Sequence, residues 1–168
     1  MLFQKKIIFL LLPITLAFLS CNAQNKKQKW IEDIDFVKNE LPRRRKDFIK
    51  LIDSSEFVNS IDKLKANLDS LEDYEILFEL QQIIAKLKVA HTKLHFPNTK
   101  FLSRLPVEFE IFDDGIYITN TKNGLKKYIG QQVIAINNIP VDSVDLLLSR
   151  LISYENNYWL KNKLPKLI

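Results

Sequence analysis

The stretch VEFEIFDDGIYIT, residues 107–119, marks the point where an otherwise helical chain becomes extended. Residues 107–111 alternate apolar and polar side chains, which is typical of a half-buried strand. Asp113-Asp114-Gly115 is a turn signal, because Asp and Gly tolerate the positive φ that tight hairpins require. Residues 116–119 return as a second strand, so the sequence predicts a β-hairpin here.

The rest of the C-terminal half continues in short pieces. Gly124 and Gly130 bracket a short helical piece, residues 132–136 form another expected strand, and Asn137-Asn138 turns the chain into residues 139–141. Asp142 is expected to cap a further helix. The buried side of that helix is expected at Val144, Leu147, Leu148 and Leu151. The last segment, residues 156–168, is very apolar for a chain end, with Tyr158, Trp159, Leu160, Leu164, Leu167 and Ile168.

The N-terminal half has the period of helices from residue 30 to about residue 88, in three apolar stripes. Pro42 is expected to end the first helix, Ser54 or Ser55 to cap the second, and Asp73 to cap the third. The buried faces are expected at Trp30, Ile34, Val37 and Leu41, at Phe57, Ile61, Leu64 and Leu68, and at Ile76, Leu77, Leu80, Ile83, Ile84 and Leu87. Together, the patterns of the two halves predict an α+β fold, with a three-helix N-terminal region, a small β-rich module and C-terminal helices.

The composition excludes several classes of protein. With 46% hydrophobic and 27% charged residues, the chain is neither disordered nor membrane-spanning throughout. The formal charge of +5 falls to +3 without Lys5 and Lys6 of the expected signal, which is a mild excess. The only dense basic run, residues 43–46, follows Pro42 and is expected to be a solvated turn. We therefore predict no nucleic-acid partner. Cys21 is the single cysteine, which excludes an intrachain disulfide and a cysteine-held metal.

The first residues predict export. Residues 1–6 supply a short positive start, and residues 7–19 form an apolar run too short to span a bilayer as a helix. Phe18-Leu19-Ser20-Cys21 resembles the lipobox of bacterial lipoproteins, in which the cysteine receives a lipid and becomes the new N-terminus. The alternative is an ordinary signal, cut after Ala23. Residues 22–29 are polar and lysine-rich and are expected to serve as a tether.

Several stretches carry a resemblance to a known family. They are WIEDIDF (30–36) with ELP (40–42), DYE (73–75) followed by an apolar helix into AHT (90–92), YIGQQVIAINNIPV (128–141), ISYEN (152–156) and YWL (158–160). Their order resembles the N-terminal half of a tail-specific, or C-terminal-processing, serine peptidase-like protein, a group that includes tricorn-type proteases. The resemblance covers nearly all of residues 30–168. It implies that residues 99–152 form a PDZ-like module.

The resemblance gives one candidate catalytic residue, His91. In tricorn-like members a histidine from this region acts as general base for the serine, and imidazole suits that proton transfer. Val89 and Ala90 replace the family's Asp and Gly, so no carboxylate lies beside His91 in the sequence. The alternative is a helix-end histidine bonded to a carbonyl. His91 and His95 have the spacing of zinc-binding helices, but the Glu of such helices is missing, and we predict no metal and no cofactor.

The PDZ-like resemblance implies a second activity. An exposed strand edge accepts an extended peptide as an added strand, with backbone N–H groups holding its C-terminal carboxylate. Leu105, Val107 and Phe109 occupy the corresponding loop and edge, although Pro106 lacks an N–H there. The alternative is that this module is a rigid spacer.

These observations predict a lipoprotein-type signal over residues 1–21, a tether over 22–29, a helical domain over 30–98, the PDZ-like module over 99–152 and an apolar linker over 153–168. The sequence contains no Gly-x-Ser-x-Gly elbow, and its three glycines hardly suffice for an oxyanion loop. We therefore expect the non-catalytic N-terminal part of an exported, envelope-located serine peptidase-like lipoprotein, inactive alone, whose catalytic core is absent here. The alternative is an anchored module that binds peptide or protein tails without enzymatic activity.

Overall fold

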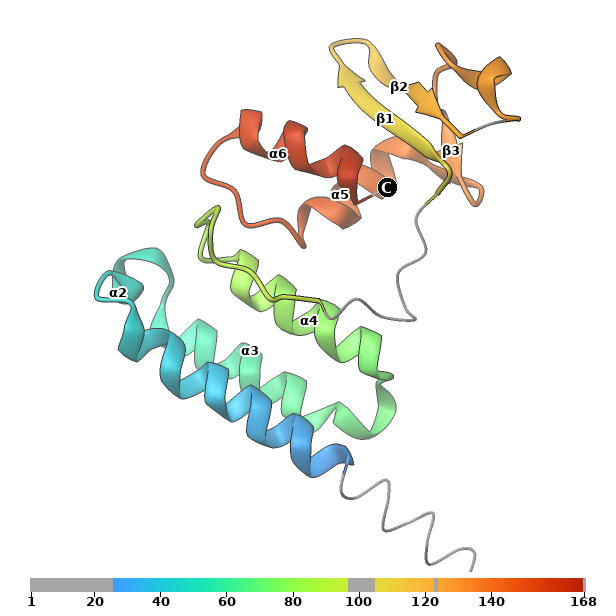
Figure 1. Ribbon diagram of the computed structural model, residues 1–168. Coiled ribbons are helices and arrows are strands. Elements are labelled where there is room, and N and C mark those ends of the chain that lie inside the picture. The colour runs from blue at the N-terminus through green and yellow to red at the C-terminus, as the bar shows by residue number, and fades with distance from the viewer. Residues whose placement is uncertain (1–25, 97–104, 123, 168) are drawn as a thin grey trace, which may run out of the picture.

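The computed structural model describes residues 26–96, 105–122 and 124–167 (Figure 1). Its helical body consists of a helix over residues 26–44, α2 (Phe48–Leu51), α3 (Ser54–Ala66), the 3₁₀-helix η1 (Leu68–Ser70) and α4 (Asp73–Ala85). The three long helices confirm the prediction made from the apolar stripes, whereas the single turn α2 was not predicted.

The core of the helical body is formed by the stripes that face one another. Ile34, Phe57, Ile61 and Leu87 are at most 1% exposed, and the ring of Phe48 meets that of Phe57 edge-on at 5.0 Å between centroids. Burying one such side chain contributes roughly 1.5–3 kcal/mol. The full buried cluster is Ile34, Phe48, Ile52, Phe57, Ile61, Leu64, Leu68, Ile76, Leu80, Ile83, Ile84 and Leu87, with Trp30, Val37 and Leu41 packed against it.

The first helix reaches into the expected tether, because it is helical from residue 26 onward. Lys26 forms an ion pair with Asp73 at 3.0 Å, and Lys27 forms one with Asp69. The indole N–H of Trp30 donates to Asp73 Oδ1 at 2.8 Å. Lys26 and Lys27, which were expected to be solvated from their composition, therefore contact the start of α4 and η1.

The other end of this helix continues through Pro42 to residue 44, so the prediction that Pro42 ends it was wrong. The backbone N–H of Arg45 still donates to the carbonyl of Leu41 at 3.2 Å. Pro42 lacks the N–H for one helical hydrogen bond, and the ion pairs of Arg43 and Arg44 with Glu40 lie in the same turn.

The predicted caps of α3, Ser54 or Ser55, and of α4, Asp73, lie one or two residues too late. Asp53 caps α3, since its carboxylate accepts from the backbone N–H groups of Ser55 and Glu56 at 2.8 and 3.0 Å. Glu72, not the aspartate that follows it, is the N-cap of α4, and its backbone N–H donates to the carboxylate of Glu75 at 2.8 Å. Carboxylates at these positions satisfy free N–H groups and interact favourably with the helix dipole.

The predicted hairpin is confirmed. Strands β1 (Val107–Phe112) and β2 (Gly115–Thr121) pair antiparallel, and Phe112 lies opposite Gly115 across the Asp113-Asp114 turn. Gly115 has φ +148°, and a Cβ on it would lie 2.2 Å from Nε2 of Gln132. The close approach of that side chain, as well as the backbone conformation, explains a glycine here.

The next expected strand, residues 132–136, is only partly present. The residues that pair with β2 are 130–133, which begin before the predicted strand. Gly130 N–H donates to Ile118 O at 2.8 Å, Ile118 N–H to Gln131 O at 3.0 Å, and Val133 N–H to Ile116 O at 2.8 Å. Of the predicted strand, Ala135–Ile136 form β3, which pairs with β4 (Ile139–Pro140). Asn137 and Asn138 join them with φ of 50° and 65°, the left-handed conformation that two-residue hairpin loops require.

The C-terminal helices are α5 (Val141–Ser149), α6 (Asn157–Lys163) and the 3₁₀-helix η3 (Leu164–Lys166). Pro140, not Asp142, is the N-cap of α5. Leu147 is 51% exposed, so its place on the predicted buried side was wrong, whereas Leu164 of η3 is buried.

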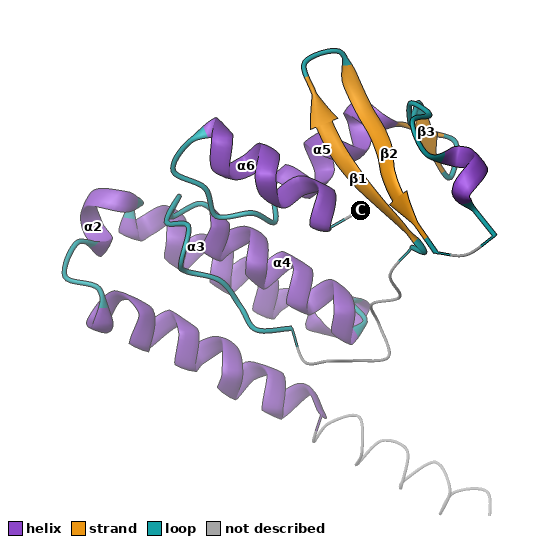
Figure 2. Cartoon of the chain, turned by 45° about the horizontal axis from the view of Figure 1, so that its top comes forward, coloured by secondary structure: helices purple, strands orange, loops and turns teal. Residues whose placement is uncertain are grey.

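The chain thus combines helices with two small antiparallel sheets, which is compatible with the expected α+β class. In both views α6 lies above α4 and to the left of the β1–β2 hairpin (Figure 2). Within the described residues, no helix has the length and apolar character needed to cross a membrane.

Candidate functional site

The helical body and the C-terminal segment meet at a buried amide. Gln81 of α4 is 2% exposed; its Nε2 donates to the carbonyl of Leu151 at 2.7 Å, and its Oε1 accepts from the backbone N–H of Leu94 at 2.8 Å. A buried amide needs such partners, because an unpaired polar group is costly to bury. One side chain therefore ties α4 to residues 89–94, here called the 89–94 loop, and to the segment after α5.

Thr92 is the second tie within the 89–94 loop. Its carbonyl accepts from the hydroxyl of buried Ser153 at 2.7 Å, and its Oγ1 accepts from Nη1 of Arg45 at 3.0 Å. The same guanidinium donates two hydrogen bonds to Asp47, which lower the pKa of that carboxyl. Arg45 is thereby oriented toward Thr92, since the fork geometry of guanidinium fixes its remaining N–H groups.

His91 lies between two anchored neighbours. On one side the backbone N–H of Ala90 donates to Oε1 of Glu155 at 3.3 Å, and on the other side is Thr92. The His91 side chain is exposed, and its ring and the Trp159 ring are arranged edge to face with centroids 5.8 Å apart. The ammonium of Lys163 lies over the same indole, 4.4 Å from its centroid. The loop therefore presents an imidazole on the surface while its backbone is held from within.

His91 is not at the end of a helix, so the alternative prediction of a helix-end histidine was wrong. α4 ends at Ala85, and Lys88, with φ 54°, turns the chain away before the 89–94 loop begins. His91 and His95 therefore do not share a helical face. No group of three or more His, Cys, Asp or Glu side chains in the described part of the chain could hold a metal ion.

The three candidate peptide-binding residues differ in accessibility. Leu105 is 46% exposed, Val107 is half-buried and Phe109 is buried on the face of β1. The carbonyl of Pro106 already accepts from the backbone N–H of Lys122 at 3.0 Å. Leu105 and Val107 thus offer surface to a ligand, whereas Phe109 supports β1 from inside. The candidate lipidation site, Cys21, lies outside the described residues.

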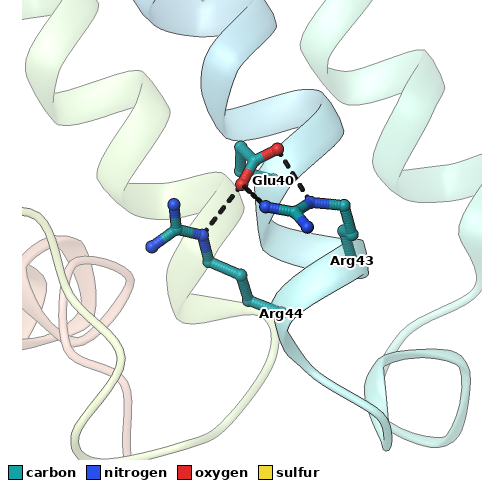
Figure 3. Close-up of polar contacts among 3 residues, drawn as sticks. All are labelled: Glu40, Arg43 and Arg44. Carbon is teal, nitrogen blue, oxygen red and sulfur yellow. Dashed lines mark hydrogen bonds and ion pairs between the residues drawn. The ribbon is translucent and has the colours of Figure 1, made fainter.

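The basic run at residues 43–46 is occupied by local pairing. Arg43 donates to both carboxylate oxygens of Glu40, at 2.9 and 2.6 Å, and Nε of Arg44 donates to the same group at 2.9 Å (Figure 3). These hydrogen bonds, that of Arg43 first, lower the pKa of Glu40 to about 2. Arg43 and Arg44 lie in the last turn of their helix, where cations interact favourably with the dipole.

Sequence reasoning missed Gln81, Ser153, Glu155 and Trp159 as parts of this arrangement. Gln81 carries a signal in retrospect, because it is a polar residue inside the apolar stripe of α4. The other three lie on a distant segment whose contact with the 89–94 loop depends on the tertiary fold. Searches against protein-family models, curated proteins and solved structures found no match, so this arrangement is interpreted from its own chemistry.

Proposed function

We propose that this chain is the non-catalytic N-terminal portion of an exported tail-specific serine peptidase-like lipoprotein, and that it supplies His91 as general base. The observation that carries the proposal is the exposed imidazole on an internally anchored loop. A base supplied to another part of a protein must be accessible and must also hold its direction. The 89–94 loop meets both conditions.

In the intact enzyme, a serine hydroxyl would attack the peptide carbonyl while one ring nitrogen of His91 takes the hydroxyl proton. The same proton would then pass to the leaving amine, and water would release the acyl group by the same steps. The serine and the oxyanion-binding groups would come from a core outside residues 1–168. The chain alone is therefore expected to be inactive.

The proposal also gives roles to the other parts. The β1–β2 hairpin, residues 130–133, the β3–β4 turn and α5 follow one another as the family resemblance leads us to expect for a PDZ-like module. Residues 1–21 would direct export, and a lipid on Cys21 would hold the protein in the cell envelope.

The test begins with the DNA downstream of the codon for Ile168. The proposal expects an in-frame or frameshifted continuation that encodes a glycine-rich serine core. The chain would then be joined to that core and assayed with fluorogenic peptides. Activity should be lost in His91→Ala and kept in His95→Ala, a matched change at another exposed histidine. A clean stop with no such core nearby, or equal activity of both variants, would reject the assignment.

A second candidate function is capture of a peptide tail along β1 without catalysis. It is favoured by the position of β1, which has a single partner strand among the described residues and is preceded by exposed Leu105, two residues before its start. Fluorescence anisotropy with labelled peptides would test it. Binding should require a free C-terminal carboxylate and weaken in Leu105→Asp, while Leu146→Asp on α5 serves as the control. Equal binding of amidated peptides would count against carboxylate capture.

A further inference from the structure

The two residues next to His91 are both held by one short segment. Ser153 is 4% exposed, and its hydroxyl donates to the Thr92 carbonyl at 2.7 Å, while Glu155 accepts from Ala90 N–H at 3.3 Å. A buried hydroxyl with a directed bond fixes its acceptor, because leaving it unpaired is costly. The backbone on each side of His91 therefore takes its position from residues 153–155.

The same segment also places the aromatic ring that His91 meets. It runs directly into Asn156, whose Oδ1 accepts from the backbone N–H of Trp159 at 2.9 Å and so begins α6. The His91 ring then meets Trp159 edge-on at 5.8 Å. One segment thus sets both the loop that carries the imidazole and the surface against which the imidazole rests.

We propose that Ser153 and Glu155 are positioning residues for His91. They act through the backbone of the 89–94 loop, and together they keep the imidazole against Trp159 in a single direction. The importance of this for catalysis rests on the proposed function, but the positioning itself belongs to the isolated chain. It can therefore be measured without any serine core.

Fluorine NMR of the chain labelled with fluorotryptophan gives the readout. The chain has two tryptophans, and comparison with Trp159→Phe assigns the Trp159 line. Removing the imidazole in His91→Gln should displace that line, because the His91 ring lies against the Trp159 ring, and this displacement is here called the step. His95→Gln should leave the line in place, and in every other variant the step is measured by adding His91→Gln.

The positioning variants are Ser153→Ala and Glu155→Ala. Each should reduce the step by about half, since a loop with fewer anchors opens at low free-energy cost. Ser149→Ala is the matched control, because the Ser149 hydroxyl also bonds a backbone carbonyl, that of Leu146 at 2.8 Å, and its loss should leave the step unchanged. Glu155→Gln keeps an acceptor without the charge and should restore the step.

Glu155 is exposed, so Glu155→Ala decides the question even where Ser153→Ala fails to fold. A full step in Glu155→Ala, or no His91-dependent step in the wild type, would overturn the proposal. Failure of the serine peptidase assignment would leave these shifts unaffected. Loss of the shifts with an active enzyme would instead remove the positioning role alone.

Discussion

Replacing Gln81 with leucine should destabilise the protein strongly. The change preserves most of the side-chain volume but leaves the Leu94 N–H and the Leu151 carbonyl without their partner at 2.8 and 2.7 Å. Each part-buried group left unpaired costs about 1–2 kcal/mol. The free energy of unfolding should therefore fall by about 2–4 kcal/mol, a large share of the roughly 5–15 kcal/mol of an ordinary domain.

Urea denaturation followed by circular dichroism would measure this loss. Gln82→Leu is the control, because within the described residues the Gln82 side chain makes no hydrogen bond, and its effect should stay within about 0.5 kcal/mol. Gln81→Glu keeps an acceptor for Leu94 but cannot donate to Leu151, so it separates the two bonds. A Gln81→Leu protein as stable as the wild type would refute the reasoning that this amide holds the junction.

Three further predictions concern the fold around the site. Asp53→Ala removes the acceptor that caps α3 and should cost about 1 kcal/mol in thermal unfolding. The Glu40 carboxyl should titrate near pH 2 by carbon NMR, and its pKa should rise in Arg43→Ala. Because the folded pKa is depressed from 4.5, the Glu40 contribution to stability is full above that pH and is lost as pH falls toward 2. Gly115→Ala should lower stability by about 1–3 kcal/mol in urea; adding Gln132→Ala should relieve the steric part of that loss and leave the part due to φ.

The local parts of the fold could be predicted from the sequence. The β1–β2 hairpin follows from alternation and one turn signal, and the faces of α3 and α4 follow from apolar spacing, because both patterns are set by near neighbours. Pro42 shows the limit of local rules. Its helix continues because Arg45 still bonds Leu41, and the turn is closed by ion pairs that propensity does not weigh.

Only part of the candidate site could be predicted from the sequence. His91 was predicted from a family resemblance, its catalytic role stays a prediction, and the structure places it at an exposed position. Its supports were not found, because Ser153 and Trp159 are far from it in the chain, and no sequence period links them to the 89–94 loop. Phe109 shows the opposite case: strand alternation gave its face, but the contact of β1 with η3, far along the chain, could not be predicted from local pattern.

The large sequence separation between Gln81 and its partner Leu151 also affects the order in which the chain folds. Its contact with Leu151 spans 70 residues, whereas the helical body is held by helices that are neighbours in sequence. Contacts of small sequence separation form first, because they close short loops at low entropic cost. During synthesis, residues 26–85 can therefore collapse into their core before residues 151–155 have emerged. The junction at His91 would then be assembled last, on a body that is already folded.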